Sequence, residues 1–250
     1  MPSVSELTAV YGNFMLSPRH GPGVCEICFN LTDDYARCYA CAHGTQRLDT
    51  VVPISYSVAR EQLHHALASY KRLDGEVARR LQAQLAAVLW RFLAAHERCL
   101  ASVTGANGFD VVTTVPSGER TRDESHPLRR IVSELVGPTR DRHERLLDRS
   151  ERPITPREFS LDKFTPRREL RGEAVLLIDD TWTTGASAQS AAAALKMAGA
   201  GHVAAVVIGR HLNREWHEND RRLRGISRPF HWDACALCDA GRLPRAQNAA

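Results

Sequence analysis

The sequence predicts an α/β protein, a doubly wound parallel sheet with a small N-terminal zinc-binding module and a helical segment. Three observations support this class. Strand patterns alternate with helical patterns through residues 109–224, which is typical of a parallel sheet. Residues 174–187 have the pattern of a buried strand, a polar turn and a helix start. Two Cys-x2-Cys pairs lie close together near the start of the chain.

Pattern and composition divide the chain into four parts. Residues 1–50 are the zinc-knuckle module, 51–104 a helical segment that packs on the core, 105–230 the α/β core, and 231–250 a C-terminal tail with a third Cys-x2-Cys pair. A chain of 250 residues is long enough for one large domain with such appendages.

The composition, 43% apolar and 25% charged residues, is that of an ordinary globular protein. No run approaches the roughly 20 apolar residues that cross a bilayer, and no secretory signal pattern is present. We therefore expect a cytoplasmic protein without a membrane segment. The net charge is +4, with basic residues concentrated in 120–171 and 210–228. These segments are either solvated surface or a positive rim for pyrophosphate or nucleic acid.

The first two cysteine pairs predict a structural zinc site. Nine residues separate the pair Cys25 and Cys28 from the pair Cys38 and Cys41. Two such knuckles supply the four thiolates of a tetrahedral zinc site and leave no position for a catalytic water. Disulfides are the alternative, but they are rare in cytosolic proteins. A segment this short has little core, so metal binding would supply its folding energy.

The third pair, Cys235 and Cys238, has His231 four residues upstream. It indicates a second zinc site, a redox pair or two ordinary thiols, and the spacing does not choose among them. A zinc site would need a fourth ligand, and the candidates are His20, His211 and His217. Cys99 lies in a helical pattern, where we expect it to be a small buried apolar residue.

Apolar residues recur at three- and four-residue spacing from Ser57 to His96, with a break at Asp74 and Gly75, which predicts two helices. A short β-branched strand follows at Phe109–Val115, and a helix at His126–Val136.

Residues 137–156 are charged and poorly periodic, which is typical of a functional or mobile loop. Arg140, Arg142 and Arg145 would let this loop close over a site and exclude water. The remaining predicted elements are strands at 157–164, 173–180 and 202–209 and helices at 187–198 and 213–224.

The segment from Asp179 to Ser187 has the chemistry of a ribose-phosphate site. Asp179 and Asp180 end a predicted parallel strand, where carboxylates can accept hydrogen bonds from ribose hydroxyls. The Thr- and Gly-containing turn that follows leads into a helix, whose first N–H groups favour a phosphate. A buried strand with a capped helix, Ser187 being the N-cap, is the plainer interpretation, but it explains neither the paired acids nor the threonines.

This segment resembles the signature of type I phosphoribosyltransferases, which bind 5-phosphoribosyl 1-pyrophosphate (PRPP). The resemblance implies that Asp179 and Asp180 are the catalytic acids and hold the ribose 2′- and 3′-hydroxyls. It also implies that the threonine-rich turn wraps the 5-phosphate and that the loop at Ser117–Glu119 contacts pyrophosphate, with Arg120 as charge partner. The PRPP-binding residues implied are Asp179, Asp180, Thr181, Thr183, Thr184, Gly185, Ala186, Ser187, Ser117 and Gly118.

Residues 25–210 are similar to the ComF family of competence-associated proteins, which join a zinc knuckle to a phosphoribosyltransferase core. The matching parts are the two N-terminal cysteine pairs, Tyr70-Lys71, VVTTVP at 111–116 and VLLIDDTWTTGAS at 175–187. This resemblance implies PRPP as ligand, with Mg²⁺ bridging pyrophosphate and ribose oxygens.

Three functions are consistent with these patterns. The first is a phosphoribosyltransferase that acts on a nucleobase or another amine. The second is a non-catalytic protein that senses PRPP or a nucleotide. The third is a DNA-uptake accessory that contacts single-stranded DNA or a DNA-processing protein. A homodimer is compatible with all three.

Overall fold

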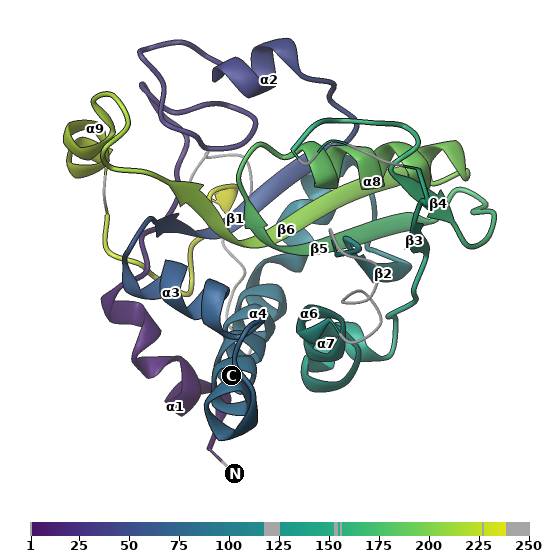
Figure 1. The fold of residues 1–250 in the computed structure, drawn as a ribbon, viewed down its shortest axis with the longest axis horizontal. Helices are drawn as coiled ribbons and strands as arrows, with labels where there is room; N and C mark the ends of the chain where they lie inside the picture. Colours follow the sequence, from purple (N-terminus) through teal and green to yellow (C-terminus); the bar gives the residue numbers. More distant parts are fainter. Residues whose placement is uncertain (1, 118–125, 153–154, 156, 227, 239–250) are drawn as a thin grey trace.

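The computed structural model describes residues 2–117, 126–152, 155, 157–226 and 228–238. Its main sheet has four strands in the order β1-β6-β5-β2, and every neighbouring pair is parallel (Figure 1). The strands are β1 (Thr50–Val58), β2 (Val111–Thr114), β5 (Ala174–Trp182) and β6 (His202–Leu212). The predicted α/β class with a parallel sheet is confirmed.

Alternate residues of the strands serve two separate cores. Leu176 and Ile178 of β5 face one core, and Val175 and Leu177 face the other. All four side chains are fully buried. A strand buried on both faces shows a continuous apolar run, which is why Ala174–Ile178 carries no alternation.

Helices cover both faces of the sheet (Figure 1). The 30-residue helix α4 (Gly75–Thr104) packs with α3 (Gln62–Ser69) on one face, and α8 (Ala186–Met197) packs on the other. The remaining helices are α1 (Val4–Ala9), η1 (Tyr11–Asn13), α2 (Tyr39–His43), α6 (Pro127–Arg130), η2 (Ile131–Leu135), α7 (Gly137–Arg140) and α9 (Asn219–Ile226). Within the described part of the chain, no helix is both long and apolar enough to cross a membrane.

The sequence analysis did not predict strand β1. It lies at the start of residues 51–104, which were assigned to the helical segment. Its residues from Val51 to Val58 are all buried, so the period of two is lost. Pro53 also argues against a central strand. It is tolerated because β1 is an edge strand of the sheet, with β6 as its one neighbour in it.

Helix α8 begins earlier than the sequence analysis expected. Gly185 is its N-cap, with a φ of 83° in the left-handed region, so the expectation that Ser187 caps the helix is wrong. Ser187 instead lies in the first turn. Helix α4 continues to Thr104, beyond the expected end at His96, and stops at Gly105 in the left-handed conformation.

The segment 137–156 is ordered over its first half, which corrects the expectation of one long loop. After α7, the Arg142 carbonyl accepts from the N–H of Val112 at 2.9 Å, and the N–H of Glu144 donates to the Val112 carbonyl at 2.9 Å. The Arg142 guanidinium holds both carboxylate oxygens of Glu97 at 2.7 and 2.8 Å and the Phe109 carbonyl at 2.8 Å. Arg142 is therefore a structural anchor for this segment.

The second half of that segment enters a two-stranded antiparallel sheet. Strand β3 (Leu147–Arg149) pairs with β4 (Phe164–Pro166), so the strand expected at 157–164 overlaps the observed one only at Phe164. The helix expected at 213–224 is likewise α9, which begins later, at Asn219.

We predict that Arg142→Ala lowers the free energy of unfolding by about 2 kcal/mol, because Glu97 and two carbonyls lose a charged hydrogen-bond donor. Arg140→Ala is the matched control. It removes only a 3.5 Å pair with the exposed Asp141 and should cost less than about 0.5 kcal/mol. Urea unfolding followed by circular dichroism measures both, and equal costs for the two variants would contradict the anchor.

Candidate functional site

Parallel pairing gathers the ends of three strands at one edge of the sheet. Thr114 at the end of β2 lies opposite Ile178, and the Val115 N–H donates to the Ile178 carbonyl at 3.0 Å. On the other side of β5, Thr181 lies opposite Gly209. Ser117 lies three residues beyond the end of β2, on the same side of the sheet as the acidic pair, and it is partly exposed. Gly118, Glu119 and Arg120 lie outside the described residues.

The two neighbouring acids have different surroundings. Asp180 is 3% exposed, accepts a hydrogen bond from the Tyr70 hydroxyl and forms an ion pair with Lys71, both through Oδ2. Asp179 is partly exposed, and its Oδ1 accepts from the Asp180 N–H at 2.8 Å. No side chain of the described residues donates a hydrogen bond to Asp179. Asp179 is therefore the carboxylate that is available to a ligand. Asp180 is held by Tyr70 and Lys71, the two residues that follow α3.

These surroundings set the charges of the pair. Burial, and then the charge of Asp180, raise the pKa of Asp179 to about 7, against the opposing effects of Lys71 and of the Asp180 N–H. Burial, and then the charge of Asp180, keep the pKa of Tyr70 well above its usual range. The Tyr70 hydroxyl thus remains a donor at neutral pH.

The turn after β5 is open to solvent at its tip. Thr183 and Thr184 are exposed, whereas Gly185 is buried beneath them. A Cβ on Gly185 would lie 2.1 Å from Cζ2 of Trp182, and the φ of 83° there also favours glycine. The Thr184 hydroxyl accepts from the Ala186 N–H at 3.3 Å, which fixes the start of α8.

The turn therefore presents hydroxyls at the start of a 12-residue helix. The first N–H groups of a helix have no partners within it and attract an anion. Of the other predicted ligands, Thr181, Ala186 and Ser187 are partly exposed.

Basic side chains lie around the same edge. The Arg157 carbonyl accepts from the Thr184 hydroxyl at 3.4 Å, which places residue 157 beside the turn. The rings of His64 and His211 lie 5.3 Å apart. Burial lowers the pKa of His211, as do the charges of His64, Arg210 and Arg157. Lys71 and Arg157 favour an anionic ligand at this edge, whereas His64 and His211, whose pKa values are both lowered, carry little charge near neutral pH.

The first cysteine cluster has the geometry of a metal site. The sulfurs of Cys25, Cys28, Cys38 and Cys41 all lie within 4.8 Å of one another, and all four residues are buried. Cys28 Sγ and Cys38 Sγ are 3.6 Å apart. Tetrahedral zinc with Zn–S bonds of about 2.3 Å places its sulfurs about 3.8 Å apart, so these residues fit a structural zinc.

Arg210 connects this cluster to the end of β5. Its side chain is buried, and Nε donates to the Cys28 carbonyl at 2.9 Å while Nη1 donates to the Trp182 carbonyl at 3.1 Å. Nη2 lies 3.7 Å from Cys28 Sγ. Among the described residues, no carboxylate forms an ion pair with Arg210. A zinc tetrathiolate carries net negative charge and would balance this buried cation.

The second cluster corrects two expectations. Its members are His96, Cys99, Cys235 and Cys238, whose ligand atoms all lie within 4.8 Å. Cys99 is thus part of a polar cluster and not merely a small apolar residue. The candidate ligands His231, His20, His211 and His217 are not in the cluster.

Sequence reasoning missed contacts between distant segments. His96 and Cys99 are three residues apart on α4, so the spacing of a helix places them on one face, and this was the available signal. Tyr70 and Lys71 were noted for a resemblance alone, and Arg210 was counted as part of a basic segment. No known protein family matches this chain, and no curated protein sequence does.

We predict that the melting temperature of Asp179→Asn, relative to the unmodified chain, increases between pH 5 and pH 8. The unfolded carboxyl titrates near 3.8 and the folded one near 7. Between these values the folded state keeps a proton that the unfolded state has lost, so rising pH destabilises the unmodified chain.

Linkage over this pH range gives a difference of about 2–3 kcal/mol, which is roughly 5 °C in a chain of this size, measured by thermal unfolding. Asp141→Asn controls for loss of an exposed charge. A pH-independent difference for Asp179→Asn would contradict the raised pKa.

Proposed function

We propose that this chain binds PRPP with Mg²⁺ at the carboxyl edge of its sheet and acts as a phosphoribosyltransferase-like protein of the ComF type. One observation carries the proposal: Asp179 lies partly exposed in the carboxyl-terminal part of β5, which leads through Trp182 into an exposed threonine turn and the start of α8. Ligands of open α/β sheets bind at such edges.

In this proposal the turn holds the 5-phosphate. The hydroxyls of Thr183, Thr184 and Ser187 and the first N–H groups of α8 would donate to its oxygens. Gly185 is necessary because a side chain there would collide with Trp182 and change the path of the turn. The exposure of both threonines supports this role, since an anion could reach them, with the Thr184 hydroxyl turning from the Arg157 carbonyl to the phosphate.

The two acids would have separate roles. Asp179 would accept hydrogen bonds from the ribose 2′- and 3′-hydroxyls, because no side chain of the described residues occupies it. Asp180 would chiefly hold Lys71 in place, since Tyr70 and Lys71 share its Oδ2. The Lys71 side chain is 35% exposed, and its ammonium group would then face the pyrophosphate.

In the transfer reaction, a nitrogen nucleophile would form a bond to C1 of the ribose as the bond from C1 to the pyrophosphate oxygen breaks. The electron pair of that bond leaves with pyrophosphate, and the nucleophile's proton passes to solvent or to a base. Mg²⁺ would neutralise pyrophosphate charge, while the chain orients the ribose and supplies positive charge.

A non-catalytic PRPP-binding protein is the second candidate. The burial of Asp180 and its engagement by Tyr70 and Lys71 favour it, because only one carboxylate of the pair is then free to assist chemistry. Release of pyrophosphate from PRPP on addition of a panel of nucleobases distinguishes the two functions.

We predict that Asp179→Asn with Asp180→Asn weakens PRPP binding in the presence of Mg²⁺ at least tenfold, because charged acceptors for the ribose hydroxyls are lost. Isothermal titration calorimetry measures the affinity, and circular dichroism verifies that the variant is folded. Asp141→Asn, an exposed acid, is the matched control and should bind like the unmodified chain.

Asp179→Asn alone serves as a second variant, since it leaves the buried Asp180 contacts in place. Unchanged affinity in both folded variants, or the absence of PRPP binding by the unmodified chain, would contradict the proposed function.

A further inference from the structure

Every cysteine of this chain belongs to one of two clusters. The sequence contains seven cysteines, of which four form the first cluster and three join His96 in the second. The second cluster combines one face of α4 with the segment that ends the described part of the chain. We propose that His96, Cys99, Cys235 and Cys238 hold a second structural zinc ion, which fastens this segment to α4.

The distances within the second cluster match tetrahedral coordination. Cys238 Sγ lies 3.3 Å from Cys99 Sγ, 3.4 Å from Cys235 Sγ and 3.5 Å from His96 Nδ1. Cys99 Sγ lies 4.0 Å from the same nitrogen. Zinc bonds of about 2.3 Å to sulfur and 2.0 Å to nitrogen place ligand atoms about 3.5–3.8 Å apart. All four ligand atoms lie within 4.8 Å of one another, and an outward movement of the thiols by a few tenths of an ångström would give zinc distances.

The His96 ring is oriented as a metal ligand. Its Nε2 lies 2.9 Å from the Trp232 carbonyl, which can only accept, so Nε2 carries the proton. Nδ1 is then an unprotonated acceptor, and it faces the three thiols. A histidine that binds metal through one nitrogen commonly donates the other N–H to a carbonyl in this way. The contact between His96 Nε2 and the Trp232 carbonyl does not depend on the positions of the sulfurs, and it independently supports a metal site at Nδ1.

The described segment at 228–238 has no strand and no α-helix; it consists of turns, an isolated bridge at Pro229 and a 3-10 helical residue at Cys238. Other contacts position it: the Arg91 guanidinium lies 4.5 Å from the Trp232 ring centroid, and Pro229 forms an isolated bridge with Leu16. Ala236 and Leu237 are buried. A short segment with so few backbone hydrogen bonds gains little stability from packing, and a zinc ion bound to both elements would close a loop of more than 130 residues.

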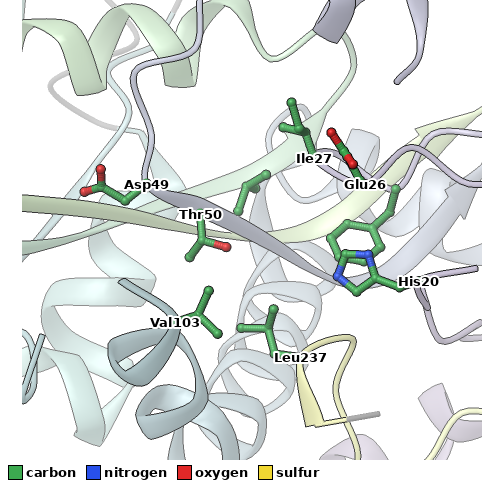
Figure 2. Close-up of a pocket in the computed structure, with 9 residues that line it drawn as sticks. His20, Glu26, Ile27, Asp49, Thr50, Val103 and Leu237 are labelled. Carbon is green, nitrogen blue, oxygen red and sulfur yellow. The ribbon is translucent and has the colours of Figure 1, made fainter. Parts of the chain in front are cut away.

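The fastened segment lies next to the outer edge of β1. Figure 2 shows Leu237 beside Val103 of α4, across from Thr50 at the start of β1, with Ile27 of the first cysteine module on the other side. These residues line a cavity of about 580 Å³. Zinc at the second cluster would hold Leu237 at this cavity.

A disulfide is the competing arrangement. An S–S bond is about 2.05 Å long, so it would join only two of the three sulfurs and leave the third and His96 without a partner. Four convergent ligand atoms favour zinc. With no position left for water, the metal would be structural rather than catalytic.

The test uses the full chain, produced in zinc-supplemented medium and purified under reducing conditions. Native mass spectrometry and elemental analysis should give two zinc ions per chain, and all seven thiols should resist a thiol reagent until a chelator is added. Cys235→Ser with Cys238→Ser should retain one zinc. His231→Ala, a histidine close in sequence but outside the cluster, is the matched control and should retain two.

A single zinc in the unmodified chain, or a Cys235–Cys238 disulfide seen as a 2 Da mass loss, overturns the proposal. If the double variant does not fold, stepwise titration of the unmodified chain with a mercurial reagent decides the question. Release of two zinc ions supports two sites, and release of one contradicts them. These outcomes do not depend on PRPP binding, which involves other residues.

Discussion

The position of the candidate site depends on the parallel register of β5 between β6 and β2. This register brings the carboxyl ends of three strands to one edge. Asp179 and Asp180 lie near the carboxyl end of β5, between the end of β2, which leads towards Ser117, and the end of β6, which carries Arg210 and His211. Because side chains alternate between faces, a slip by one residue would exchange the two cores and turn the exposed acid inward. The fully buried run from Val175 to Ile178 makes such a slip costly, and the core therefore specifies the site.

Side chains from distant segments hold the edge of the sheet in place. Tyr70 and Lys71 come from the end of α3, yet both contact Asp180. Arg210 joins the Trp182 carbonyl to the backbone and sulfur of Cys28, so the first cysteine cluster and the turn after β5 share one buried cation. The cysteine module is thus part of the support of the site, and metal bound there would influence the turn through Arg210.

Local sequence patterns predicted those elements whose residues are close together in the chain. The strand at Ala174–Trp182, the helix after it and the four-cysteine cluster follow from apolar runs and spacing. Strand β1 was missed because burial on both faces removes its alternation and Pro53 argues against a strand. Tyr70, the partner of Asp180, and His96 and Cys99, which join the Cys235–Cys238 pair, lie more than 100 residues away in the chain, and no single-sequence pattern connects them. Ser187 failed as a cap because Gly185 already adopts the conformation that starts the helix.

The central claim is that the acidic pair and the turn after it bind a phosphorylated sugar. Hydrogen–deuterium exchange of the full chain, with and without PRPP and Mg²⁺, tests it most directly, because it locates the bound ligand on the backbone. The account predicts slower exchange in the amides of residues 179–189 and around Ser117, with α9 unaffected. Binding of PRPP that leaves residues 179–189 unprotected, or that protects a different surface, would contradict it.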